Sequence, residues 1–380
     1  MAMAYAAVWF CFLSIFVNLI SLGIAAIRAR PGLMPLPPPR AAPGVSIVRP
    51  LCGLDNFSEE TLQSSFELDY PSYEIIFCVA RANDPVVPLV QRLIASHPGK
   101  PARLIVGDEK VSANPKLNNC VRGWDTANHD WIILADANVL MPEDYIQRLL
   151  FSWRRRSGLV CCMPLGSRPR NLWAELECAF LNTFEARWQY CAEAMGMGFA
   201  QGKSMLWRRE VMDNGGGIRA LGTEIIEDAA ATKLVRRQGL AVNLVAGSPF
   251  EQPLGFRTAA EVWTRQARWA RTRRKSFPFF YAPEIFAGAA LPCLTAAYAA
   301  FNFDVSVAAT LFCVALAWYI PETLLALVLK WHVSWLTPLV FMLRDLMLPV
   351  IYIDAWCIDN FVWRGNEMTV REEQPSVEQG

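Results

Sequence analysis

The chain has 380 residues, of which 53% are hydrophobic and 19% charged, and its formal net charge is +1. So small a net charge predicts no general attraction to nucleic acid. The 11 cysteines include no Cys-x-x-Cys pair and there are only 3 histidines, which argues against a zinc cluster. The apolar residues concentrate at the two ends of the chain, a distribution typical of a membrane-anchored enzyme.

The first apolar stretch, Ala2 to Ile27, contains no charged residue. About 20 apolar residues suffice for a helix to cross a bilayer. A cleaved signal peptide would begin with basic residues, whereas basic residues here come afterwards, at Arg28, Arg30 and Arg40. We therefore expect a retained transmembrane anchor over residues 1–28, and the positive-inside rule places the segment that follows in the cytoplasm.

A proline-rich linker is expected over residues 29–44, and beyond it short apolar segments alternate with helix-like stretches. The expected strands are residues 45–51, 73–80, 102–108, 130–136 and 158–164. Strand followed by helix at this spacing predicts an α/β fold, with a mostly parallel sheet flanked by helices. No Gly-x-Gly-x-x-Gly and no Walker loop follow the first strand, which disfavours a dinucleotide-binding dehydrogenase and a P-loop ATPase.

The remainder of the expected soluble domain, which we place over residues 45–280, is mainly helix-like. Residues 172–195 form an amphipathic stretch, for which a core helix and an interfacial membrane helix both stay open. A strand candidate running into a short helix and a glycine-rich turn follows at residues 202–217. Another helix is expected to begin at the adjacent acids Glu227 and Asp228, and a basic helix at residues 258–277 leads into the C-terminal apolar region.

Transmembrane or interfacial helices are expected over residues 281–360, followed by a cytosolic tail at residues 361–380. The apolar segments are residues 285–301, 307–329 and 333–358. Arg344 and Asp345 interrupt the last of these, and such charges are costly at mid-membrane unless they are paired or face a cavity. A tilted, re-entrant or interfacial helix pair is an alternative there, and the number of crossings stays open.

Asp136 ends the apolar run DWIILAD, and Asn138 lies two residues further on. In α/β sheets, ligands bind beyond the carboxyl ends of the strands, where we expect both side chains and the loop from Ala80 to Asp84. Magnesium takes oxygen ligands, often one or two carboxylates together with substrate phosphates. A carboxylate beside an amide oxygen is therefore a candidate metal site, and a simple turn after a buried strand is the alternative.

Asp228 begins an expected helix after a glycine-rich turn. The helix dipole stabilises an acid at this position, so an ordinary helix start is the alternative to a functional role. Since the helix follows the sheet, its first turn is expected at the same edge as Asp136. A carboxylate placed there can take a proton from an acceptor hydroxyl.

The basic stretch RQARWARTRRK offers a second kind of candidate. Arg265 and Arg268 share a helix face because they lie three residues apart. Two guanidinium groups can hold a diphosphate, and Trp269 can stack on a ring, whereas a juxtamembrane patch for anionic lipid headgroups is the alternative. Lys116, in NPKLNN, is equally consistent with a phosphate contact and with a solvated helix residue.

Together these motifs resemble those of membrane glycosyltransferases of the GT-A fold, which carry three spaced aspartates and a Gln/Arg-x-x-Arg-Trp element. The local sequence is most similar to the ceramide glucosyltransferase family, as a member of bacterial type, over roughly residues 1 to 370. The segments that carry the resemblance are SIVRPLCGLD (46–55), FELDYPSYEIIFCVARANDP (66–85), NPKLNN (114–119), IIEDAAATK (225–233), RQARW (265–269) and LRDLMLPVIYIDAWCIDNFVWRG (343–365).

The resemblance implies a GT-A nucleotide-sugar-binding sheet and an inverting transfer of a hexose from a UDP-sugar, with UDP-glucose favoured, to the primary hydroxyl of ceramide. It also implies that the membrane helices supply the lipid while the catalytic domain faces the cytoplasm. A bacterial inner membrane is the favoured location, or a Golgi-type membrane if the source is eukaryotic. The oligomeric state stays open.

Carried over residue by residue, the resemblance makes Asp84 a nucleotide contact. It places Asp136 at the diphosphate and at a divalent cation, Mg²⁺ or Mn²⁺. Asn138 is an optional further metal ligand, since the family tolerates Asp-x-Gly at this place. Arg81 and Asn83 stand where the family often has acidic residues. Because Asn138 supplies no charge, we expect the cation to bind weakly to the free enzyme and better once UDP adds its own oxygens.

The same resemblance makes Asp228 the catalytic base and assigns Arg265, Arg268 and Trp269 to the leaving group and the acceptor. A glycosyltransferase acting on another lipid, such as a hopanoid, or using UDP-galacturonate, is the nearest alternative. A processive polysaccharide synthase is disfavoured because its channel needs more crossings. The non-enzyme alternative is an inactive lipid-binding membrane protein that keeps the fold.

Overall fold

The computed structural model describes residues 1–32, 35–363 and 366–370, so most of the expected tail at residues 361–380 lies outside the described residues. The described residues divide into two compact units, which interleave along the chain. The helical unit comprises residues 1–28, 166–191 and those from 255 on, and the sheet unit comprises residues 29–165 and 192–254. Each unit consists of segments that are separate in the sequence. The units therefore do not test the expected domain boundaries, which stay predictions.

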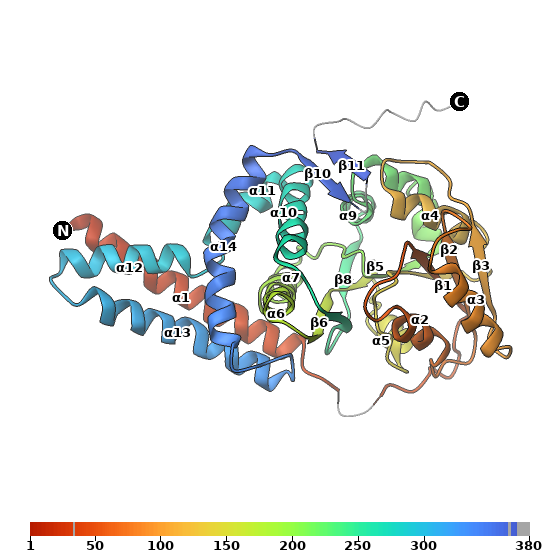
Figure 1. Cartoon of the computed structure of the whole chain (residues 1–380), viewed down its shortest axis with the longest axis horizontal. Coiled ribbons are helices and arrows are strands. Elements are labelled where there is room, and N and C mark those ends of the chain that lie inside the picture. The colour runs from red at the N-terminus through yellow and green to blue at the C-terminus, as the bar shows by residue number, and fades with distance from the viewer. Residues whose placement is uncertain (33–34, 364–365, 371–380) are drawn as a thin grey trace. The chain divides into compact units, whose positions relative to one another are not determined.

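Within the described part of the sheet unit, seven strands form one sheet in the order β3-β2-β1-β4-β7-β5-β8 (Figure 1). They are β1 (Val45–Leu51), β2 (Tyr73–Val79), β3 (Ala102–Val106), β4 (Trp131–Ala135), β5 (Ser157–Cys162), β7 (Ser204–Arg208) and β8 (Ala241–Leu244). β3, β2, β1 and β4 are parallel, as are β5 and β8, whereas β7 is antiparallel to both β4 and β5. The predicted mostly parallel α/β sheet is confirmed.

Helices cover both faces of this sheet, which is why its strands are almost continuously apolar. They are α2 (Ser58–Gln63), α3 (Val87–Ser96), α4 (Pro115–Asp125), α5 (Tyr145–Phe151), α8 (Arg209–Asp213) and α9 (Glu227–Arg237), with 3-10 turns at Ser64–Phe66 and Ile218–Thr223. Ile47 and Phe77 share one apolar core with Tyr145 of α5. On α4, a Cβ at Gly123 would lie 2.6 Å from the Cys78 sulfur, so glycine allows α4 to pack closely on β1 and β2.

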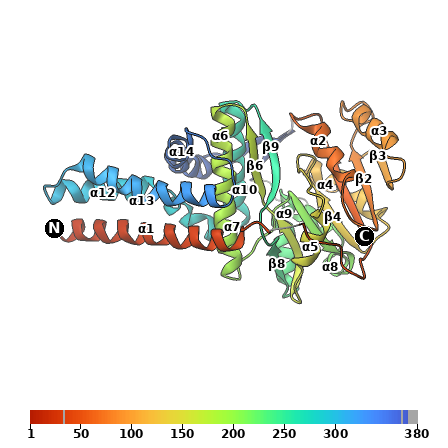
Figure 2. The same cartoon turned by 90° about the horizontal axis from the view of Figure 1, so that it is seen from below.

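The helical unit contains the long apolar helices (Figure 2). Its elements are α1 (Ala2–Arg28), α6 (Leu172–Ala179), a π-helical turn (Phe180–Ala186), α7 (Arg187–Ala194), α10 (Ala259–Ser276), α11 (Pro278–Tyr281), a 3-10 turn (Ala282–Phe286), α12 (Ala290–Asn302), α13 (Val307–Val328), α14 (Thr337–Cys357), β10 (Asn360–Trp363) and β11 (Asn366–Thr369). α1 lies alongside α12 and α13, and α10 lies against α14. Short strands β6 (Pro164–Pro169) and β9 (Phe250–Gly255) lie where the chain passes between the units.

Among the described helices, α1 and α13 are long and apolar enough to cross a membrane. Residues 278–286 and 290–302 form a pair bent by 43°, which would make a third span if the pair crosses as one. The expected apolar helices near both ends of the chain are therefore present. The bend falls before α12, and α14 is a single helix rather than the pair that its internal charges suggested.

Those internal charges are paired. Arg344 and Asp345 of α14 and Glu322 of α13 are all buried. Nη1 of Arg344 lies 2.5 Å from Oε1 of Glu322, and Nη2 lies 2.8 Å from Oδ1 of Asp345. Thr183, in the π-helical turn, accepts a further hydrogen bond of 2.8 Å from Arg344. One guanidinium thus balances two carboxylates and ties α13, α14 and the π-helical turn together.

Arg344→Met is expected to destabilise the protein by about 3 kcal/mol, because it removes the cation that contacts two buried carboxylates. Thermal unfolding of the detergent-solubilised variant should show a clear fall in the midpoint. Arg92→Met is the matched control, since the Arg92–Glu59 pair is exposed and such pairs contribute about 0–1 kcal/mol. Equal midpoints for the two variants would show that the buried charges contribute no stability.

Candidate active site

Two antiparallel neighbours, β4 and β7, bring Asp136 and Lys203 together. Asp136 directly follows β4 and Lys203 directly precedes β7. Since Ala135 pairs with Ser204 in the ladder, the end of one strand lies beside the start of the other. The Asp136 N–H donates to the Lys203 carbonyl at 3.0 Å. The carboxylate predicted from the end of β4 therefore has a lysine beside it that comes from a distant part of the chain.

The N-termini of α4 and α9 meet at the same place. Asn114 caps α4 by accepting from the N–H groups of Lys116 and Leu117, and the preceding loop is thereby fixed. The Asn114 side chain is completely buried, and its amide donates to Oε2 of Glu227 at 2.7 Å. This bond joins the first turn of α4, which carries Lys116, to the first turn of α9, which carries Glu227 and Asp228.

The resulting ion pairs define the Lys116 cluster, which consists of Lys116, Asp136, Lys203 and Glu227. The ammonium of Lys116 lies 2.6 Å from Oδ1 of Asp136, 2.6 Å from Oε1 of Glu227 and 2.6 Å from the Gly202 carbonyl oxygen. The ammonium of Lys203 lies 2.9 Å from Oδ2 of Asp136. Both lysine side chains are largely buried, at 14% and 13% exposure. Lys116 is therefore not a solvated helix residue.

The charges of the cluster stabilise one another. Burial alone would raise the pKa of Asp136, but the two lysine ammonium groups hold it below its usual range. Burial alone would lower the pKa of Lys116, but the carboxylates of Asp136 and Glu227 raise it above its usual value. The cluster thus contains two ammonium groups, each paired with a carboxylate, and ammonium groups of this kind can bind the phosphates of a nucleotide.

Asp228, beside the cluster, is in a different electrostatic position. Burial and the negative charge of Glu227 raise the pKa of Asp228 to about 7, and they outweigh the opposing effects of Lys116 and of the N–H groups of Ala229 and Gly202. The Ala229 N–H donates to its Oδ1 at 2.8 Å. A carboxyl group with a pKa near neutrality can both accept and release a proton, which is what general base chemistry needs.

Asn138 and Asp136 offer oxygens of the type that Mg²⁺ and Mn²⁺ bind. The Lys203 ammonium also donates to Oδ1 of Asn138 at 3.2 Å, so one cationic group contacts an oxygen of each predicted ligand. Two protein oxygens leave the remaining positions of a divalent cation to substrate phosphates and water. Within the described residues, no group of three or more His, Cys, Asp and Glu side chains could hold a metal. A divalent cation held by these two oxygens would have to take the point that the Lys203 ammonium takes in this structure, and the metal site stays a prediction.

Asp84 lies in the loop after β2, outside the Lys116 cluster. Its carboxylate accepts from the Gly53 N–H at 3.0 and 3.1 Å and from the Val86 N–H at 2.9 Å. Gly53 has a φ of +67°, a backbone conformation that favours glycine. Asp84 thus fixes the loop after β1 against the loop after β2, and its nucleotide contact stays a prediction.

Arg265, Arg268 and Trp269 lie on α10 of the helical unit. Arg265 forms an ion pair with Glu177 of α6, whose side chain is completely buried. A buried carboxylate restricts the orientation of this guanidinium. The structure thus groups Lys116, Asp136 and Asp228 with Asn138 in one unit, and it places the arginines and the tryptophan in the other.

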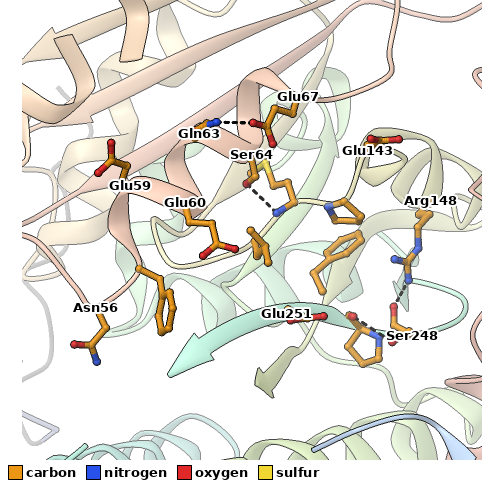
Figure 3. A pocket seen from close by; sticks show the side chains of 16 residues that line it. Asn56, Glu59, Glu60, Gln63, Ser64, Glu67, Glu143, Arg148, Ser248 and Glu251 are labelled. Carbon is orange, nitrogen blue, oxygen red and sulfur yellow. Dashed lines mark hydrogen bonds between the residues drawn. The ribbon is translucent and has the colours of Figure 1, made fainter. Parts of the chain in front are cut away.

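A cavity of about 730 Å³ in the sheet unit has a mainly acidic lining (Figure 3). Its walls include Arg148 and five glutamates, namely Glu59, Glu60, Glu67, Glu143 and Glu251. The guanidinium of Arg148 donates to the Ser248 carbonyl. Since an acidic lining repels a diphosphate, we place the candidate nucleotide site at the Lys116 cluster rather than in this cavity.

The sequence pattern of glycosyl transferase family 21 matches residues 11–375. The chain belongs to glycosyl transferase family 21. It is 25% identical to ceramide glucosyltransferase 1 of Caenorhabditis elegans, over 87% of this chain and 72% of that protein. It is 38% identical to a ceramide glucosyltransferase of Komagataella phaffii over a shorter stretch, 30% of this chain and 23% of that protein.

The fold of this family 21 member is similar to that of a mannosyltransferase from Pyrobaculum calidifontis, solved in complex with GDP-Man and Mn²⁺. The two have a TM-score of 0.55 and 17% sequence identity, over 91% of this chain and 98% of the mannosyltransferase. A likeness at this identity concerns the fold alone. The predicted GT-A fold is confirmed, and family membership makes the chain a glycosyltransferase.

In this family 21 glycosyltransferase, sequence reasoning missed Asn114, Gly202 and Lys203. A Cβ at Gly202 would lie 2.8 Å from Oε1 of Glu227 and 2.9 Å from Nζ of Lys116, so a glycine there lets the cluster close around its backbone. The available signal was the segment GKS at the start of the strand candidate in residues 202–217. This segment indicates a site only because β7 pairs with β4, and its own residues do not specify that pairing.

Proposed function

We propose that the chain transfers a hexose, with glucose favoured, from a UDP-sugar to the primary hydroxyl of ceramide with inversion at the anomeric carbon. The observation that carries the proposal is the Lys116 cluster with Asp228 beside it, at the carboxyl end of β4. The family and its similar relatives, which are ceramide glucosyltransferases, support the choice of acceptor.

In this mechanism Asp228 takes the proton of the acceptor hydroxyl while the hydroxyl oxygen bonds to the anomeric carbon. Attack comes from the face opposite UDP, and the bond between that carbon and the diphosphate oxygen breaks, so UDP leaves with the electron pair. An alcohol is a poor nucleophile near neutral pH, and a positioned base typically contributes about 10²–10⁴-fold. The pKa of Asp228, near 7, suits this task.

Negative charge that develops on the departing diphosphate is stabilised by Lys116 and Lys203. Arg265, Arg268 and Trp269 are proposed to contact the leaving group and the acceptor, and Asp84 the nucleotide. A divalent cation held by Asp136 and Asn138 would supply Lewis-acid stabilisation of the diphosphate oxygens when bound. The apolar helices keep the ceramide chains in the membrane, and we propose that the catalytic part, residues 45–280, faces the cytoplasm.

The test is a lipid analysis of the purified protein in liposomes that contain ceramide, with UDP-glucose and Mg²⁺ or Mn²⁺. Mass spectrometry should detect a hexosylceramide, and NMR should give a β-linkage from the α-linked donor. Parallel samples contain UDP-galacturonate, or a hopanoid in place of ceramide. A product only with UDP-galacturonate would reject glucose as the sugar, and a product only with the hopanoid would reject ceramide as the acceptor. No product in any sample would favour the inactive lipid-binding protein.

A further inference from the structure

The position of Lys203 has a consequence for metal binding. Its ammonium lies 2.9 Å from Oδ2 of Asp136 and 3.2 Å from Oδ1 of Asn138. These are the two side chains predicted to hold a divalent cation, and Lys203 contacts both at once. The Lys203 side chain is 13% exposed, so little water screens the charge of this ammonium.

A divalent cation and the Lys203 ammonium cannot share these oxygens. Both are positively charged, and at such short separations in a largely buried site their repulsion is strong. The carboxylate of Asp136 is further neutralised by Lys116 at 2.6 Å. Metal entry therefore requires Lys203 to leave the oxygens of Asp136 and Asn138. Lys116 also contacts Glu227 and the Gly202 carbonyl, so it can stay in place.

We propose that Lys203 is a built-in competitor of the divalent cation. In the nucleotide-free enzyme its ammonium occupies the point between Asp136 and Asn138 and excludes the metal. A nucleotide diphosphate attracts the ammonium to its own oxygens, and the released carboxylate and amide oxygens then bind the cation together with the phosphates. Nucleotide and metal consequently bind with positive cooperativity, and each raises the affinity for the other by the same factor. The inference rests on the proposed function only in taking UDP as the nucleotide.

The test is a titration of the full-length protein in detergent with Mn²⁺, followed by electron paramagnetic resonance, with and without UDP and corrected for Mn²⁺ bound to free UDP. Lys203→Met should raise the Mn²⁺ affinity of the nucleotide-free protein at least about tenfold. The gain in Mn²⁺ affinity that UDP produces should shrink correspondingly. Lys233→Met, which removes a lysine paired with Glu224 in the same unit, should leave the Mn²⁺ affinity unchanged.

An Mn²⁺ affinity that Lys203→Met does not alter overturns the proposal. If Lys203→Met does not fold, the parent enzyme supplies the test. Tight Mn²⁺ binding without UDP, or a Mn²⁺ affinity that does not increase with UDP, contradicts competition by Lys203. The titration does not depend on turnover. Cooperative Mn²⁺ and UDP binding in a protein that makes no glycolipid would reject the proposed function alone, and glycolipid synthesis with tight nucleotide-free Mn²⁺ binding would reject this inference alone.

Discussion

Asp228→Asn should lower the rate of sugar transfer by about 100-fold or more, because an amide cannot accept the proton of the acceptor hydroxyl. The substitution keeps the size of the side chain and an oxygen that can accept from the Ala229 N–H, as Oδ1 of Asp228 does at 2.8 Å. UDP affinity should therefore change little. The measurement is the initial rate of glycolipid formation at saturating donor, together with UDP binding by calorimetry.

The pH dependence of the parent enzyme gives the same assignment a second check. The pKa of Asp228 is raised to about 7, so the carboxyl group is protonated below that pH and cannot act as a base. Plotted against pH, kcat/KM should be level above about pH 7 and should fall towards acid, approaching tenfold per pH unit. The Asp228→Asn variant should lack this step.

Asp125→Asn is the matched control for both experiments, since Asp125 forms an exposed ion pair with Arg219 away from the cluster. Its rate and its pH profile should be those of the parent. An Asp228→Asn enzyme that works as fast as the parent would remove Asp228 from the mechanism. A lost rate with an unchanged acidic limb would mean that another group produces the pH dependence.

The alternation of apolar and helix-like segments predicted the parallel part of the sheet, because each strand is a short apolar run followed by its crossover helix. The expected segments at residues 45–51, 73–80, 102–108, 130–136 and 158–164 all correspond to strands. The antiparallel insertion of β7 between β4 and β5 could not be predicted in this way. A five-residue strand that is buried at its first four positions has no alternating pattern, and its composition does not specify its neighbours.

The same physical limit applies to the candidate site. Asp136 and Asp228 could be singled out because strand ends and helix starts are recognisable locally. Lys203 could not, since its proximity to Asp136 arises from the register of β4 with β7. Similarly, the charge at Arg344 could be recognised as needing a partner, but the π-helical turn that contributes Thr183 interrupts what looked like one helix over residues 172–195.

Lys116→Met should impair both stability and chemistry, because this one ammonium serves two largely buried carboxylates. Removing it leaves Glu227, and partly Asp136, without a counter-charge, and breaking such a pair costs about 3–5 kcal/mol. The thermal midpoint should fall well below that of Lys233→Met, the control for loss of a lysine in the same unit. UDP affinity should fall as well, since the proposed phosphate contact of Lys116 is lost.

A pH measurement separates this role of Lys116 from a purely structural one. The charge of Lys116 lowers the pKa of Asp228 and so opposes burial and Glu227. Without that charge the protonated form of Asp228 is favoured, and the acidic limb of kcat/KM should move to higher pH. Lys116→Arg keeps the charge and should leave the limb near pH 7. If Lys116→Met lowers stability but leaves the limb in place, Lys116 holds the fold together without tuning the base.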